Sequence, residues 1–160
     1  MANIAIIIGS ASDRPVVNRA EEILRSFKVS YTLRVLSAHR TPEETAEFAK
    51  TLDGNYDAVI AAAGKAAHLA GAVAAHTLVP VIGLPIKTDV MGGLDSLLSI
   101  VQMPRGIPVA TVAIDGAENA ALLALQIAAP RDPGLLHKLK EYRKQMRESS
   151  LSADSEAQSE

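Results

Sequence analysis

The sequence contains no cysteine among its 160 residues. Disulfides, thiolate metal sites and cysteine nucleophiles are therefore excluded, and we expect the chain to work in a reducing cytoplasm. Tryptophan is also absent, and aromatic residues make up only 3% of the chain. The sequence thus lacks the aromatic side chains on which proteins stack single-stranded nucleic acid.

A large excess of charge of either sign is missing as well. Charged residues make up 21% of the chain and the formal net charge is −2, so we expect no broad basic surface for DNA or RNA. The longest stretch of small apolar residues, 61–75, contains Lys65 and His68 and is not expected to span a membrane. We therefore expect a soluble protein without nucleic-acid or membrane partners.

Five apolar runs are typical of buried strands. They are rich in Val, Ile and Ala with little polar alternation, as in parallel strands that are covered on both faces. The runs are 3–9, 32–37, 57–63, 79–85 and 107–114. Candidate helices follow the runs, at about 13–27, from Pro42 onward, 66–77, 94–102 and 116–129, and the first has the apolar spacing of a helix that rests on a sheet. This alternation predicts one three-layer α/β/α domain over residues 1–130, with a five-stranded parallel sheet.

The C-terminal part has a different pattern. Residues 131–148 predict an amphipathic helix, packed on the domain or on a neighbouring subunit. One side of this helix is apolar and carries Leu135, Leu139, Tyr142 and Met146. The last residues, 149–160, are small, polar and acidic, and predict a disordered tail.

The loops that follow the strands are the candidate site, because parallel α/β sheets bind ligands beyond the carboxyl ends of their strands. After the first run, "GSASD" combines the flexible Gly9 with the hydroxyls of Ser10 and Ser12 at a helix start, which suits a phosphate. Asp13 could accept hydrogen bonds from ribose hydroxyls or cap the helix. The loop matches neither the dinucleotide-binding nor the Walker A glycine pattern, which disfavours dinucleotides and ATP.

The second run ends in "SAHR", which brings Ser37, His39 and Arg40 to the same edge of the sheet. Arg40 offers a planar guanidinium for phosphate or carboxylate. His39 can exchange a proton near neutral pH, because an unperturbed histidine has a pKa of about 6.5. The competing interpretation is that Thr41 and Glu44 form a capping box, with His39 as a solvated residue before the helix.

The loop after the third run, from Gly64 to Leu69, leaves room for a pocket lined by backbone, because most of its side chains are small. Lys65 adds a cation, and His68 lies one turn further on, where a histidine is more often structural than catalytic. No His, Asp and Glu spacing typical of a metal site is present, nor a Gly-x-Ser-x-Gly elbow. The residues by themselves predict an α/β protein that binds an anionic, phosphorylated ligand, without naming a reaction.

Several long motifs occur together and in order: "GSASD", "SAHRTPEE", "AAGKAAHLAG", "PVIGLP", "GLDSLLSIVQMPRGIPVATVAI" and "NAALLALQIAA". Over about residues 4–129 the chain closely resembles the class I N5-carboxyaminoimidazole ribonucleotide mutases of purine biosynthesis. The resemblance implies a flavodoxin-like fold, a homo-octamer with active sites shared between subunits, and no metal, ATP or nicotinamide. The small ribonucleotide substrate would lose its carbamate carboxyl as carbon dioxide, retain it in the pocket and take it up again on a ring carbon.

The resemblance also assigns roles to residues. His39 would deliver and remove the proton, because it occupies the histidine of the Ser-Ala-His-Arg motif. The phosphate and ribose would be bound by the first two loops, through Ser10, Ser12, Asp13, Ser37 and Arg40. The base and the migrating carboxyl would be surrounded by the third loop, through Gly64, Lys65, Ala66, His68 and Leu69. The segment 93–96 would help to close the site.

Two positions depart from the usual class I loop, Gly-Gly-Ala-Ala-His-Leu-Pro-Gly. Lys65 replaces the second glycine and Ala70 replaces the proline. Class II relatives, which use free carbon dioxide, carry a basic residue near position 65, so a carboxylase on the same scaffold is the first alternative. A catalytically idle nucleotide-binding subunit is the second. A flavin-binding protein of similar fold is disfavoured by the scarcity of aromatic residues.

Overall fold

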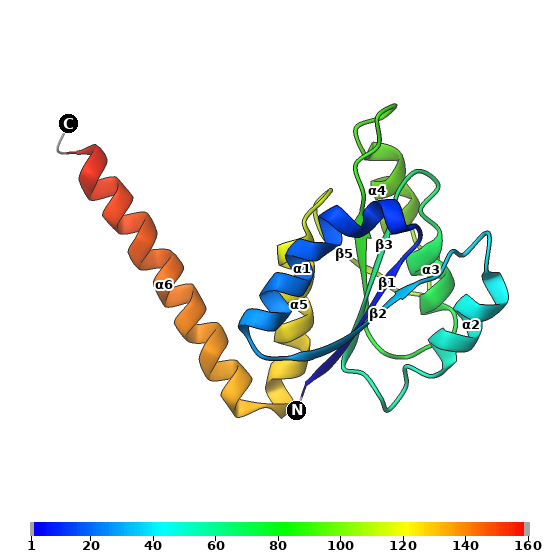
Figure 1. Ribbon diagram of the computed structural model, residues 1–160, viewed down its shortest axis with the longest axis horizontal. Coiled ribbons are helices and arrows are strands. Elements are labelled where there is room, and N and C mark those ends of the chain that lie inside the picture. Colours follow the sequence, from blue (N-terminus) through cyan, green and yellow to red (C-terminus); the bar gives the residue numbers. More distant parts are fainter. Residues whose placement is uncertain (1, 159–160) are drawn as a thin grey trace.

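A computed structural model describes residues 2–158 and shows a parallel five-stranded sheet between two layers of helices (Figure 1). The strands are β1 (Asn3–Ile8), β2 (Ser30–Val35), β3 (Ala58–Ala63), β4 (Val81–Pro85) and β5 (Ala110–Thr111). They lie in the order β2-β1-β3-β4-β5, and each neighbouring pair is parallel. The predicted three-layer class is therefore confirmed. The run 107–114 forms only the two residues of β5, and Pro108 within it has no N–H to donate to a neighbouring strand.

The helices cover both faces of the sheet. They are α1 (Arg14–Ser26), α2 (Pro42–Lys50), α3 (Leu69–Ala74), α4 (Leu94–Val101), α5 (Ala117–Ala128) and α6 (Pro133–Ala157), with the short turns η1 (Ala11–Asp13) and η2 (Ala129–Arg131). Side chains of β1 alternate between the faces, so Ile4, Ile6 and Ile8 pack with α1 and α5, whereas Ala5 and Ile7 pack with α2 and α3. Burial on both sides explains why this strand shows no polar alternation.

The segment before α2 corrects one prediction. The helix begins at Pro42 as expected, but Thr41 makes no side-chain capping bond, so the predicted capping box is wrong. Instead, Thr41 Oγ1 accepts from the N–H of Ser37 at 2.8 Å and donates to the carbonyl of Ser37 at 3.1 Å. The hydroxyl is used to close the turn 37–41, which holds His39 and Arg40 in place.

Gly83 marks a close approach between β4 and α4. A Cβ atom at this position would overlap Ile100 Cγ2 and lie 3.0 Å from Val109 Cγ1, and Ile100 is fully buried. We expect Gly83→Ala to lower the free energy of unfolding by about 1–2 kcal/mol through overpacking, as measured by urea denaturation. Gly134→Ala is the matched control, because its Cβ would meet only Asp132 Oδ1, at 3.4 Å. Equal midpoints for the two variants would show that α4 moves aside without cost.

The C-terminal helix α6 packs on the domain through its first turns. Leu135 and Leu139 are buried, the rings of Tyr142 and Phe27 lie 5.6 Å apart, and Lys138 Nζ donates to the Phe27 carbonyl at 2.7 Å. The helix then continues to Ala157, so residues 149–157, for which composition predicted disorder, are helical and exposed. The last two residues of that predicted tail lie outside the described residues. No helix within residues 2–158 has the length and apolar character needed to cross a membrane.

Candidate active site

Three loops meet at the carboxyl ends of β1, β2 and β3. Because β1 lies between the other two strands, the segments 9–13, 36–41 and 64–68 emerge side by side. Backbone hydrogen bonds join them: Gly9 N–H donates to the Ala62 carbonyl and Leu36 N–H to the Ile8 carbonyl, both at 3.0 Å. From β1 the chain continues to β2 on one side of it, and β3 then lies on the other side of β1. The strand order therefore reverses at the carboxyl end of β1, and parallel α/β sheets bind ligands at such a switch point.

Arg40 connects the second loop to the first. Its Nη2 donates to the Gly9 carbonyl at 2.7 Å, and its Nε donates to Ser37 Oγ at 3.4 Å. Ser37 Oγ also accepts from the Arg40 backbone N–H at 3.2 Å. A guanidinium has five N–H donors, so donors remain for an anion in front of the first loop.

Asp13 is the buried carboxylate of the first loop. It accepts from the Ser10 N–H at 3.2 Å and from Ser12 Oγ at 3.5 Å, and Ser12 Oγ also donates to Ser10 Oγ at 2.9 Å. Asp13 stands at the N-cap of α1 but makes no side-chain capping bond there, so the predicted helix cap is wrong; its carboxylate instead completes a capping box with Ser10 around η1.

Burial raises the pKa of Asp13 above its usual value of 3.8, against the opposing effects of Ser10, Ser12 and the Arg40 charge. A raised folded-state pKa means that folding favours the neutral carboxyl. The contribution of Asp13 to stability is therefore largest below pH 3.8 and decreases as the pH rises through its folded pKa. Ionising Asp13 in the folded protein therefore costs stability, which is typical of a residue retained for binding or catalysis.

His39 and His68 face each other, although they are 29 residues apart in the sequence. His39 Nε2 lies 2.8 Å from His68 Nδ1, and the rings meet edge to face with centroids 4.9 Å apart. One of these two nitrogens must carry the shared hydrogen, so the tautomers of the two imidazoles are coupled. The residues alone favoured a structural role for His68, whereas the fold makes it the hydrogen-bond partner of His39.

The remaining residues of the third loop lie in different surroundings. Gly64 is half-buried beside Ile86 and Thr88, and Ala66 is exposed. Lys65 is exposed and adopts a left-handed backbone with φ of 58°. Leu69, at the start of α3, is only 1% exposed and belongs to the core, so its side chain is not presented to a ligand.

The segment after β4 is held beside the third loop by side-chain hydrogen bonds. Ser96 is fully buried and donates to the carbonyls of Ile86 at 2.7 Å and Gly93 at 2.8 Å. Thr88 Oγ1 donates to Asp95 at 2.7 Å and accepts from the Gly93 N–H at 3.3 Å. Ser96 thus anchors the segment 93–96, and Thr88, which was not among the predicted site residues, lies next to Gly64. The only sequence signal for Thr88 is its place between a buried strand and the Gly92-Gly93 pair.

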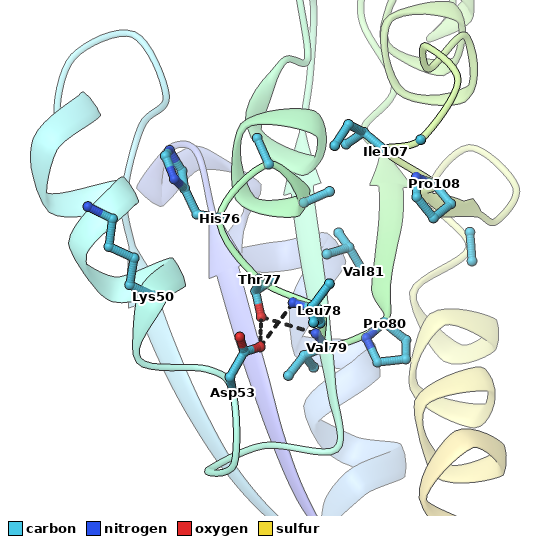
Figure 2. Close-up of a pocket in the computed structure, with 14 residues that line it drawn as sticks. Lys50, Asp53, His76, Thr77, Leu78, Val79, Pro80, Val81, Ile107 and Pro108 are labelled. Carbon is cyan, nitrogen blue, oxygen red and sulfur yellow. Dashed lines mark hydrogen bonds between the residues drawn. The ribbon is translucent and has the colours of Figure 1, made fainter.

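A cavity of about 660 Å³ lies at the opposite, amino end of β4 (Figure 2). Asp53 accepts from Thr77 Oγ1 at 2.5 Å and from the Leu78 N–H at 3.0 Å, and so holds the rim of this cavity. No residue of the three loops lines it. Within residues 2–158, no cluster of three or more His, Asp or Glu side chains could hold a metal ion.

Comparison with known proteins agrees with the motifs. The family model described as AIR carboxylase matches residues 3–149, which include all three loops. The chain belongs to the AIR carboxylase family. It is 55% identical over 148 residues to the N5-carboxyaminoimidazole ribonucleotide mutase of Pyrococcus abyssi, which covers 92% of this chain and 85% of that protein. It is 51% identical over 146 residues to the protein of the same name from Escherichia coli K12, covering 89% and 86%.

The tertiary structure agrees with this AIR carboxylase assignment. The crystal structure of Treponema denticola PurE superposes with a TM-score of 0.89 at 28% sequence identity, over 98% of both chains. The predicted flavodoxin-like fold and the resemblance seen in the motifs are confirmed.

Lys65 departs from the glycine of the usual class I loop in this family, and its backbone keeps a conformation that suits glycine. Replacing Lys65 by Gly should raise the free energy of unfolding by about 0.5–1 kcal/mol, because a left-handed backbone strains a residue with a Cβ atom. Urea denaturation measures this gain. Lys28→Gly is a matched control outside the site, since Lys28 has a φ of 57°. A loss of stability in Lys65→Gly alone would show that the lysine side chain makes compensating contacts.

Proposed function

We propose that this chain is an N5-carboxyaminoimidazole ribonucleotide mutase of purine biosynthesis. Such an isomerase moves a carboxyl group from the exocyclic nitrogen of an aminoimidazole ribonucleotide to a ring carbon, giving 4-carboxy-5-aminoimidazole ribonucleotide. The main observation behind this proposal is the pair of His39 and His68, whose Nε2 and Nδ1 atoms lie 2.8 Å apart. The pair lies beside the first loop, to which Arg40 is hydrogen-bonded. About half of the sequence is identical to relatives with this name, which supports the same reaction.

His39 is the proposed acid and base. In the first step the carbamate N–C bond breaks, carbon dioxide leaves, and the nitrogen takes a proton from the imidazole. In the second step the ring carbon attacks carbon dioxide, and the proton on that carbon returns to the imidazole. No proton is gained or lost overall, so one imidazole that gives a proton in the first step and takes one in the second serves both steps. His68 sets the orientation and tautomer of His39 through their shared hydrogen bond.

The first two loops are the proposed site for the sugar phosphate. Arg40 faces the phosphate with its remaining N–H donors, and Ser10 and Ser12 contribute hydroxyl groups. The carboxylate of Asp13 repels a phosphate and therefore suits the ribose hydroxyls. The third loop is the proposed site for the base and the migrating carboxyl group. The ammonium group of Lys65 could bind that carboxylate there. The proposed reaction needs no cofactor.

A homo-octamer in the cytoplasm is the proposed working form. An apolar surface on α4 and the loop before it supports assembly, since a monomer would leave these side chains in water. Val90 is 92% exposed and Met91 52%, and Leu94, Leu98 and Val101 follow on α4. This surface adjoins the closing segment, so a neighbouring subunit there would complete the site. Sedimentation equilibrium should report the mass of eight 16.8 kDa chains.

A substrate comparison tests the reaction. The protein is incubated with N5-carboxyaminoimidazole ribonucleotide at low bicarbonate, and separately with aminoimidazole ribonucleotide at increasing carbon dioxide. Rapid carboxyl transfer without added bicarbonate supports the mutase. Product formed only at high carbon dioxide assigns a carboxylase instead, in line with a basic residue at position 65, and ribonucleotide binding without turnover would leave an idle subunit.

A further inference from the structure

Asp115 follows β5 in a strained backbone conformation. Its φ is 55°, in the left-handed region. It is the third residue of the turn 113–116, which the Gly116 N–H closes by donating to the Ala113 carbonyl at 2.9 Å. Glycine or asparagine is the usual residue where a turn needs a positive φ at this place, because a Cβ atom strains the left-handed backbone. Other residues persist there when their surroundings fix them, commonly at functional sites.

The side chain of Asp115 does the work of a backbone carbonyl. The Asp115 N–H donates to the Pro85 carbonyl at 2.8 Å. In parallel strands, a residue that donates in this way accepts, through its own carbonyl, from the N–H two residues further on, which here is Lys87. The turn directs the Asp115 carbonyl elsewhere, to the Ala117 N–H at 2.9 Å and Arg19 Nη2 at 2.6 Å. Oδ1 of Asp115 therefore accepts from the Lys87 N–H instead, at 2.8 Å.

Lys87 lies at the start of the connection 86–93, which leads from β4 to α4. The end of this connection folds back on its start, because a Cβ atom at Gly93 would lie 3.2 Å from Lys87 Cα and 2.7 Å from Ile114 Cγ2. Ile114 precedes Asp115 in the turn. The turn thus contacts both ends of the connection, and the bond from the Lys87 N–H fixes where the connection begins.

The connection 86–93 borders the candidate site. A Cβ atom at Gly64 of the third loop would lie 3.5 Å from Ile86 Cβ and 3.7 Å from Thr88 Cγ2, so the connection and the loop are in contact. In the proposed function this loop surrounds the base and the migrating carboxyl group. A misplacement of about 1 Å at such a site can cost about a hundredfold in rate. The position of the connection therefore matters for turnover.

We propose that Asp115 is a positioning residue for this site. Its carboxylate holds the connection 86–93 against the third loop through the Lys87 N–H and does not touch the substrate. The need for this acceptor explains why a strained turn position holds an aspartate rather than a glycine. The inference rests on the proposed function and adds a residue that acts on the reaction through the connection.

Two substitutions at position 115 separate positioning from folding. Asp115→Gly removes the acceptor and relieves the left-handed strain, so kcat should fall about ten- to a hundredfold while the urea midpoint stays at or above that of the wild type. Lys87 is exposed, so its N–H can bond to water in this variant. Asp115→Asn keeps an oxygen acceptor and suits the same backbone, so kcat should stay within about threefold of the wild type.

Glu118→Ala is the matched control, because Glu118 lies next to the same turn and makes only an exposed ion pair with Arg19, at 3.4 Å. It should leave kcat unchanged. Wild-type kcat in Asp115→Gly would overturn the proposal, and so would an equal loss in Asp115→Asn. A lower urea midpoint alongside the lower kcat of Asp115→Gly would also overturn it, since activity would then follow stability.

Amide hydrogen exchange of the connection 86–93 gives a readout that needs no substrate. Exchange should be faster than in the wild type for Asp115→Gly and unchanged for Asp115→Asn. Equal exchange in all three proteins would overturn the positioning role. A wild-type chain without mutase turnover removes the proposed function, whereas faster exchange in Asp115→Gly alone keeps the role of Asp115 in holding the connection.

Discussion

Replacing His39 by asparagine is expected to reduce turnover by about 10²–10⁴-fold, which leaves almost no activity, with ribonucleotide affinity within about tenfold of the wild type. Asparagine fills a similar space and retains a hydrogen-bonding group toward His68 Nδ1, which lies 2.8 Å from His39 Nε2. It cannot take up and return a proton near neutral pH. The loss should therefore appear in kcat, measured with N5-carboxyaminoimidazole ribonucleotide in a spectrophotometric assay.

Two further variants separate this effect from general damage. His76→Asn changes an exposed histidine that lines the remote cavity of Figure 2, and should leave kcat unchanged. His68→Asn should lower kcat less than His39→Asn and shift the pH dependence of the reaction, because the partner that sets the His39 tautomer is altered. If His39→Asn keeps most of the wild-type turnover, His39 is not the acid and base.

Arg40→Ala is expected to weaken ribonucleotide binding by about 1.5–3 kcal/mol, which is roughly 10- to 150-fold in Kd. The variant removes a charged donor group that Gly9 and Ser37 hold in front of the first loop, at 2.7 and 3.4 Å. Isothermal titration with aminoimidazole ribonucleotide measures the change. Most of the loss should be in affinity, with kcat at saturating substrate changed less, because Arg40 is proposed to bind the phosphate and not the reacting atoms.

Lysine at position 40 should recover only part of the affinity, since an ammonium group cannot bridge two acceptors and an anion in one plane. The matched control is Arg25→Ala. Arg25 is an exposed arginine in the last turn of α1 and donates to Tyr31 Oη at 3.0 Å. Equal Kd values for Arg40→Ala and the wild type would contradict the phosphate role.

Local pattern was a good guide to the strands and a poorer one to the caps. β1 and β3 were predictable because a strand buried on both faces must be apolar, and both are, apart from the half-buried Asn3 at the start of β1. The capping box at Thr41 was predicted from local spacing, yet its hydroxyl bonds to the backbone of Ser37. A capping bond and the observed bonds to Ser37 would each give the Thr41 hydroxyl a hydrogen-bond partner. The path of the chain after β2 decided which of the two forms.

In the candidate site, too, some features could be predicted from local sequence and others depended on the tertiary structure. The residue types and motifs predicted His39 and Arg40, because their chemistry can be read at one position in the sequence. The role of His68 could not be read in this way, since its partner lies 29 residues away and meets it only when β1 separates β2 from β3. Thr88 and Ser96 likewise acquire their contacts from the return of the chain through β4.

The order of residues by itself determined the number of strands, the alternation of helix with strand, the family, and the loops that form the candidate site. These follow from apolar periodicity and from motifs that are local along the chain. Only the tertiary structure decided that two imidazoles share a hydrogen, that Arg40 lies against Gly9, and that half of α6 projects from the domain. Such contacts depend on which strand ends lie side by side, and strand order results from the packing of the whole sheet.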